Sequence, residues 1–308
     1  MIWSGLGLLV LAQIGYPLAD DRAPLVVATV ILGFALSVGH AVATRGPRVG
    51  AALVATTAVG GLLVETLGVH TGFPFGGYAY TAALGPRLLG VPLVIPLAWT
   101  WMAWPAWLAA GVVLRGARVR RAAARIALAG LGLAAWDLFL DPQMVAEGYW
   151  HWTDPHPALP GVPGIPLTNY LGWLGVAVVM MAVFSRFGGE PAERRADAPM
   201  LALYLWTYAS SVLAHAVFLH LPASAAWGAL GMGPVAIPLA VALLRGSSLR
   251  GTGPRGGAPL RRLARLRRLA RIGWLARIGW LARIGWLARI GWLARIGWLA
   301  RLRGSAPC

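Results

Sequence analysis

Two aspartates of this chain, Asp137 and Asp141, have the type and the spacing that acid chemistry needs. They are four residues apart in an apolar stretch, so a helix places both carboxyl groups on one face. Two neighbouring carboxyls in a low-dielectric environment cannot both ionise cheaply, so at least one should keep its proton at neutral pH and act as a general acid. A structural role is the alternative, in which Asp141 ends a helix before Pro142 and Asp137 bonds to a neighbouring helix.

A third acidic residue, Glu65, is expected at the same depth as the aspartate pair. It lies near the end of the apolar run 49–69, and the pair lies near the end of the run 123–140. Both ends face the same side of a membrane when the runs are the third and fifth spans. An ionisable group inside a span is costly and marks a candidate functional site, with an interhelical hydrogen bond as the structural alternative.

Aromatic and polar residues gather in the segments that follow these acidic groups. The segment 70–80 reads HTGFPFGGYAY and the segment 147–152 reads EGYWHW, and glycine and proline interrupt any regular structure there. Such segments predict either a lid over an apolar substrate or the aromatic belt of a membrane interface. Three residues that open the run 167–187 can add hydrogen bonds or position a water. The candidate binding residues of these segments are His70, Phe73, Phe75, Tyr78, Tyr80, Thr168, Asn169 and Tyr170.

Tryptophans form a further candidate binding surface. Trp99, Trp101, Trp104 and Trp107 lie in the middle of the run 89–114, deeper than an interfacial belt, and Trp136 precedes the aspartate pair. Their π faces can stabilise a cation in a cavity, and packing against helices or lipid is the alternative. Trp101, Trp104 and Trp136 are the candidates for substrate contact.

The elements that must position these residues are membrane-spanning helices. The chain has 308 residues, of which 58% are hydrophobic and only 12% charged, with a mean hydropathy of +0.67. This composition predicts an all-α, polytopic membrane bundle of about seven to eight helices. The apolar runs are 2–17, 24–43, 49–69, 89–114, 123–140, 167–187, 199–220 and 225–245.

The loop arginines predict the orientation of this bundle. Arginines cluster after the second, fourth and sixth runs, whereas the opposite loops hold only Arg22 and Arg87. The positive-inside rule then places both termini in the cytoplasm of a bacterial cell and the acidic groups in the outer half of its membrane. The net charge of +17 is concentrated in one loop and the C-terminal segment. Membrane lipid is therefore the expected partner, and nucleic acid is not.

The composition changes beyond Leu244, so we expect two parts. Residues 1–245 are the predicted transmembrane catalytic domain, and residues 246–308 are a Gly/Arg linker and a cytoplasmic tail. The tail repeats the hexapeptide Arg-Ile-Gly-Trp-Leu-Ala from Arg271 to Ala300. It is either an Arg/Trp-rich segment adsorbed on the membrane or a tolerated tandem duplication.

Several familiar chemistries lack their motifs. There is no P-loop, no dinucleotide fingerprint and no nucleophile elbow. The single cysteine, Cys308, excludes internal disulfides and cysteine-based metal sites, and His215 and His220 are spaced poorly for a shared metal. We therefore expect neither a cofactor nor a metal.

At these residues the chain resembles a known family. The segments 70–80, 84–92, 136–144 and 164–173 resemble the carotenoid 1',2'-hydratase (CruF-type) group of membrane carotenoid biosynthesis proteins, and the resemblance covers about residues 25–240. It implies addition of water to the terminal double bond of an acyclic ψ end group, giving a 1'-hydroxy carotenoid. Gly77 departs from the family pattern, and the hexapeptide tail lies outside it.

The implied hydration suits the acidic residues. Asp137 or Asp141 would donate the proton and the other would assist, Glu65 with Asn169 would orient water, and the aromatic walls would stabilise the cation. The expected partners are membrane lipid, an acyclic carotenoid and other enzymes of carotenoid biosynthesis. Two alternatives remain open: an end-group cyclase or isomerase that starts with the same protonation, and a non-catalytic isoprenoid transporter, which predicts internal repeats.

Overall fold

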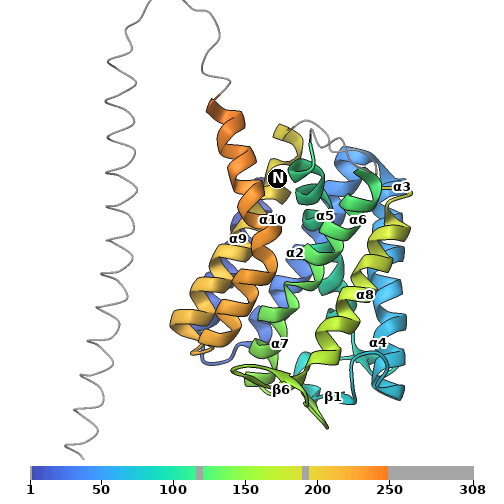
Figure 1. The fold of residues 1–308 in the computed structure, drawn as a ribbon, viewed down its shortest axis with the longest axis vertical. Helices are drawn as coiled ribbons and strands as arrows, with labels where there is room; N and C mark the ends of the chain where they lie inside the picture. Colours follow the sequence, from blue (N-terminus) through green and yellow to red (C-terminus); the bar gives the residue numbers. More distant parts are fainter. Residues whose placement is uncertain (1, 116–120, 189–193, 249–308) are drawn as a thin grey trace, which may run out of the picture. The chain divides into compact units, whose positions relative to one another are not determined.

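The protein is a bundle of α-helices with short hairpins gathered at one end (Figure 1). The computed structural model describes residues 2–115, 121–188 and 194–248. The predicted all-α membrane class is confirmed. The hexapeptide tail and most of its linker lie outside the described residues, so the predicted second part stays a prediction.

The elements follow the predicted apolar runs closely. The helical elements are α1 (Ile2–Gly15), η1 (Tyr16–Leu18), α2 (Ala23–Arg45), α3 (Pro47–Val54), η2 (Ala55–Val59), α4 (Gly60–Thr71), η3 (Ala82–Leu84), α5 (Val94–Val113), α6 (Arg121–Ala134), α7 (Asp137–Ala146), α8 (Leu167–Phe184), α9 (Arg194–Leu213), η4 (Ala214–Phe218) and α10 (Pro222–Ser248). The strands are β1 (Tyr78–Tyr80), β2 (Arg87–Leu88), β3 (Val91–Pro92), β4 (Trp150–Trp152), β5 (Ala158–Leu159) and β6 (Val162–Pro166).

Six helical segments of the described chain are long and apolar enough to cross a membrane. They are Ala23–Arg45, Pro47–Thr71, Ala122–Ala146, Leu167–Phe184, Arg195–Phe218 and Pro222–Arg245. The N-terminal helix Ile2–Leu18 is apolar but shorter. The predicted number of seven to eight spans therefore stays a prediction, as does the orientation of the termini.

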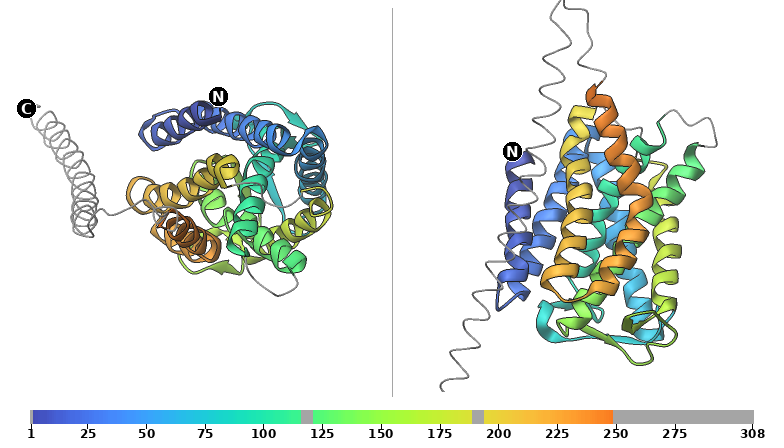
Figure 2. Two further views of the ribbon diagram at one scale, coloured as in Figure 1. Left: turned by 90° about the horizontal axis from the view of Figure 1, so that it is seen from above. Right: turned by 60° about the vertical axis from the view of Figure 1, so that its left-hand side comes forward.

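Helix α5 is the central helix of the bundle (Figure 2, seen from above). Leu97 and Val113 are the two of its 20 residues that are not buried. A helix that is apolar all round must be covered on every side, and α2, α6, α9 and α10 all contact α5. The run predicted from residue 89 starts later as a helix, because residues 87–92 form the hairpin of β2 and β3.

Prolines lie inside several helices, and at Pro142 and Pro105 a serine satisfies the carbonyl that the proline leaves without a partner. Pro142 has no N–H for the carbonyl of Leu138, and Ser224 of α10 donates its hydroxyl there at 2.7 Å. Pro105 likewise frees the carbonyl of Trp101, which accepts a 2.7 Å hydrogen bond from the Ser37 hydroxyl of α2. Helix α7 therefore continues past Asp141 to Ala146, and Asp141 does not end it.

The hairpin end brings together two segments that are far apart in sequence. Strands β1 and β4 pair antiparallel, with Tyr78 opposite Trp152 and Tyr80 opposite Trp150. Alternate residues of a strand share a face, so these four rings lie on one side of the ribbon, while Ala79 and His151 are exposed on the other. The ribbon closes this end of the bundle with its aromatic face inward.

The close approach of α2 to α5 yields a stability prediction. A Cβ atom on Gly33 of α2 would lie 1.7 Å from the Trp101 ring, whereas one on Gly39 of the same helix would meet nothing within 4 Å. Gly33→Ala should therefore lower the free energy of unfolding by about 1–3 kcal/mol through overpacking. Gly39→Ala is the matched control and should be neutral or slightly stabilising. Unfolding of the purified variants in detergent measures both, and equal stability would contradict this packing.

Candidate active site

The three acidic residues expected at one depth line a single small cavity. Glu65 comes from α4, and Asp137 and Asp141 come from α7, and all three are buried. The cavity volume is about 30 Å³. A water needs roughly 10–15 Å³ of such space and two to four polar partners, so the cavity suits one or two waters.

Two tyrosines hold the Glu65 carboxyl in place. The hydroxyls of Tyr78 and Tyr80 both donate to its Oε2, at 2.5 and 2.7 Å. These tyrosines are two residues apart in β1, and the pleat of the strand turns both toward α4. Burial, and next the nearby Glu65 charge, raise the pKa of both tyrosine hydroxyls above the ordinary value. Both hydroxyls therefore stay protonated and remain donors.

The aspartate pair is held differently from Glu65. The side-chain amide of Asn169, at the start of α8, donates to Oδ2 of Asp141 at 2.5 Å. Asp137 is the first residue of α7, one turn before Asp141, and its Oδ2 is buried without a hydrogen-bond partner in the described structure. An unpartnered carboxyl oxygen in an apolar site is costly, so it is available to a water or a substrate. Asp141 is thus anchored, and Asp137 has the freer oxygen.

Four tryptophans complete the cavity wall. The sequence placed Trp99 on a candidate aromatic surface and Trp150 and Trp152 in a candidate lid segment, but it selected none of the four for substrate contact. Trp99 of α5 and Trp173 of α8 stack with ring centroids 3.8 Å apart, and Trp150 and Trp152 of β4 lie opposite the tyrosines. The alternation in the WHW segment was the signal for the β4 pair, because every second residue of a strand shares a face. The stack of Trp99 on Trp173 joins helices distant in sequence, and no local pattern indicates it.

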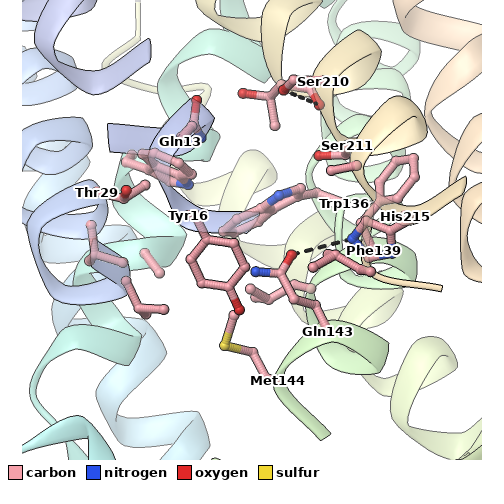
Figure 3. Close-up of a pocket in the computed structure, with 18 of the residues that line it drawn as sticks. Gln13, Tyr16, Thr29, Trp136, Phe139, Gln143, Met144, Ser210, Ser211 and His215 are labelled. Carbon is pink, nitrogen blue, oxygen red and sulfur yellow. Dashed lines mark hydrogen bonds between the residues drawn. The ribbon is translucent and has the colours of Figure 1, made fainter. Parts of the chain in front are cut away.

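A larger, mostly apolar cavity adjoins the acidic one (Figure 3). Its volume is about 120 Å³, and both Trp101 and Trp136 line it. It shares four wall residues with the acidic cavity, namely Ile95, Ala98, Leu140 and Trp150. Helix α7 lies between the two spaces, because its carboxyls face one cavity while Phe139 and Gln143 face the other. A ligand in the larger cavity would be one layer of side chains from the acidic groups.

His215 belongs to this larger cavity. Its ring nitrogens lie 3.3 Å from the Gln143 side-chain oxygen and 2.8 Å from the Ser224 hydroxyl, so both nitrogens have partners (Figure 3 labels His215 and Gln143). His220 is not part of this contact. No three His, Cys, Asp or Glu side chains of the described segments gather into a group that would hold a metal.

The remaining predicted binding residues are dispersed. Phe75 stacks on Trp173 with centroids 4.4 Å apart, behind the cavity wall, and the buried Tyr170 hydroxyl has no hydrogen-bond partner in the described structure. Trp104 lies away from both cavities, where its indole N–H donates to His40. Three others are exposed and line neither cavity, namely His70, Phe73 and Thr168.

The fold and the site define a class: a polytopic helical membrane protein with a buried, carboxyl-lined cavity beside an apolar one. Residues 25–242 match the model of the family described as "Carotenoid biosynthesis protein". The chain belongs to this family, as the resemblance of its motifs indicated.

A more specific likeness covers part of the chain. The sequence is 35% identical over 158 residues to the bisanhydrobacterioruberin hydratase of Haloarcula japonica, a match that covers 50% of this chain and 51% of that protein. The match thus spans about half the length of this relative. No solved structure matches the chain.

The hydrogen bonds from Tyr78 and Tyr80 to Glu65 predict an energetic coupling between these residues. Tyr80→Phe removes one donor to the carboxyl, and Glu65→Gln removes the acceptor charge, so the two changes should be non-additive by about 0.5–3 kcal/mol in the free energy of unfolding. Tyr208→Phe is the control partner, since Tyr208 bonds to the carbonyl of Ala229 and not to Glu65. A double-mutant cycle in detergent measures the coupling. Additive effects for the Tyr80 pair would show that the contact carries no energy.

Proposed function

We propose that this chain is a carotenoid hydratase that adds water to the terminal C1',2' double bond of an acyclic end group, giving a 1'-hydroxy carotenoid. The observation that carries the proposal is the meeting of Glu65, Asp137 and Asp141 in one buried, water-sized cavity. Membership of a carotenoid biosynthesis family and the partial likeness to a hydratase support the substrate class and the reaction.

The first step is proton transfer to C2', which leaves a tertiary cation at C1'. Asp137 is the proposed donor, because its Oδ2 has no hydrogen-bond partner in the described structure, whereas Asp141 is tied to Asn169. A positioned general acid contributes about 10²–10⁴-fold to a rate. The rings of Trp99 and Trp150 border the same space, and an aromatic face turned toward it would stabilise the cation.

The second step is capture of the cation by water at C1'. Glu65, oriented by its two tyrosine donors, would hold this water, and the Asp137 carboxylate left by the first step would take the proton that the water loses as the hydroxyl forms. One water is consumed, and the acid is restored without a cofactor. The small volume of the cavity favours this outcome, because it admits few waters beside a reactive cation.

The apolar part of the substrate would occupy the larger cavity. This cavity shares Ile95, Ala98, Leu140 and Trp150 with the acidic one, so an end group there can meet the carboxyls through a small side-chain movement. A long polyene dissolved in the membrane would reach such a site between helices rather than through the aqueous loops.

The acid assignment is tested by amide substitutions. Asp137→Asn and Asp141→Asn keep the side-chain shape but cannot donate the acid proton, so each should lower hydration by about 10²-fold or more, with the larger loss for Asp137. Pigment analysis of a host that makes an acyclic carotene measures conversion, with protein level in the membrane as a check. Asp154→Asn, in an exposed loop, is the matched control and should convert normally. Normal conversion by both site variants would refute the acid role.

The origin of the oxygen and hydrogen atoms added to the product distinguishes hydration from cyclisation and oxygenation. Membranes incubated anaerobically with an acyclic carotene in heavy-oxygen water should form an alcohol that carries the labelled oxygen and one solvent hydrogen at C2'. An isomer of unchanged formula would indicate a cyclase. A strict requirement for molecular oxygen would mean that an oxygenation, and not this mechanism, forms the product.

A further inference from the structure

The helical segment that carries the aspartate pair has two irregularities. Where α6 meets α7, the Trp136 N–H bonds to a carbonyl three residues back instead of four, which frees the carbonyl of Gly132. Pro142 has no N–H, which frees the carbonyl of Leu138. The two freed carbonyls lie on either side of Asp137 in the sequence, so regular helix geometry alone does not determine the course of the backbone there.

Hydroxyl groups from two other helices bond to these carbonyls. Tyr204 of α9 donates to Gly132 at 3.1 Å, and Ser224 of α10 donates to Leu138 at 2.7 Å. Both side chains are buried, and neither lines the acidic cavity or the larger one. They can therefore influence the chemistry only through the helix that they hold.

Ser224 reaches this backbone because α10 approaches α7 closely. Ser224, Gly228 and Gly231 are spaced four and three residues apart, so they share one face of α10. A Cβ atom on Gly228 would lie 2.4 Å from the Phe139 ring, and one on Gly231 would lie 2.5 Å from Cδ1 of Leu138. Small residues permit such close approach between membrane helices, and the short serine side chain spans the remaining gap.

His215 fixes the direction of the Ser224 hydroxyl. This hydroxyl has one hydrogen, which it donates to the Leu138 carbonyl, so its oxygen accepts from Nδ1 of His215 at 2.8 Å. Nδ1 of His215 therefore carries a proton. With a partner on each side, the serine hydroxyl is held in one orientation.

We propose that Ser224 is a positioning residue for the acid pair: its bond to the Leu138 carbonyl sets where α7 holds Asp137 and Asp141 against the substrate. The inference rests on the proposed function, in which these carboxyls transfer protons. A displacement of roughly 1 Å can cost about 10²-fold in rate, so a residue that touches no substrate can still control the chemical step.

Hydration kinetics of the purified full chain in proteoliposomes test the proposal. Ser224→Ala should lower kcat by roughly tenfold or more. KM should stay nearly constant, because Ser224 lines neither cavity. Pro142→Ala supplies a new N–H for the Leu138 carbonyl, so the double variant Ser224→Ala, Pro142→Ala should regain most of the lost kcat. Loss of packing alone would not be rescued in this way.

Ser37→Ala is the matched control. The Ser37 hydroxyl also donates at 2.7 Å to a carbonyl that a proline frees, but that carbonyl belongs to Trp101 of α5. This variant should lose a similar amount of stability and keep its kcat.

A second readout does not depend on hydration. The carboxyl stretching band of the aspartate pair is recorded by infrared spectroscopy of the protein without substrate, and its change in Asp137→Asn assigns it. Ser224→Ala should shift this band, the added Pro142→Ala should return it, and Ser37→Ala should leave it in place.

The outcomes separate this inference from the proposed hydration. An unchanged kcat in Ser224→Ala would overturn the inference, as would a lower kcat with an unshifted band or a double variant that stays slow. If Ser224→Ala does not accumulate in the membrane, recovery of protein and activity in the double variant supports the inference, and no recovery overturns it. If the unchanged protein does not hydrate, the proposed function fails, and an unshifted band in Ser224→Ala would then overturn the positioning role as well.

Discussion

Burying three carboxyl groups near one end of a membrane bundle is costly, and the surrounding structure reduces that cost. Glu65 accepts from two tyrosine hydroxyls and Asp141 from an asparagine amide, whereas Oδ2 of Asp137 is buried without a hydrogen-bond partner in the described structure. Buried ionisable groups persist in membranes when such partners or a function hold them there. Strand β1, which pairs with β4, and the start of α8 supply these partners, so the segments between the helices at this end are part of the site.

Helix α5 is central because it is apolar on every side and must be covered by its neighbours. Its tryptophans contact different surroundings along its length, with Trp99 at the acidic cavity, Trp101 at the larger one and Trp104 bonded to His40 farther along. Toward that end, a buried ion pair between Arg45 and Asp197 joins α2 to α9 with hydrogen bonds of 2.7 and 2.9 Å. Charge-assisted, bidentate bonds of this kind fix register as well as contribute energy. One end of the bundle thus holds a bidentate ion pair, and the other holds the unpartnered Oδ2 of Asp137.

Helices with prolines are usually kinked because a carbonyl loses its partner, and here the two serines restore it. Ser224 donates to the Leu138 carbonyl and also contacts His215, so the hydrogen bond that stabilises α7 lies directly behind a residue of the larger cavity's wall. The α7 helix carries carboxyls on one face and Gln143 on the other. Because residues of α7 line both cavities, a change that destabilises this helix should alter the shape of both.

The sequence by itself determined the helical membrane class, the approximate ends of most helices and the shared depth of Glu65 with Asp137 and Asp141, because hydrophobic length and i, i+4 spacing are local properties. It also indicated Asn169, Tyr78 and Tyr80. Only the tertiary structure decided which aromatic rings line the carboxyl cavity, since Trp99, Trp173 and the β4 tryptophans meet through contacts between distant segments. The structure also places Trp101 at a cavity and Trp104 away from both cavities, although the sequence made both candidates for substrate contact. The side of a fully apolar helix that faces a cavity depends on its neighbours and not on its own periodicity.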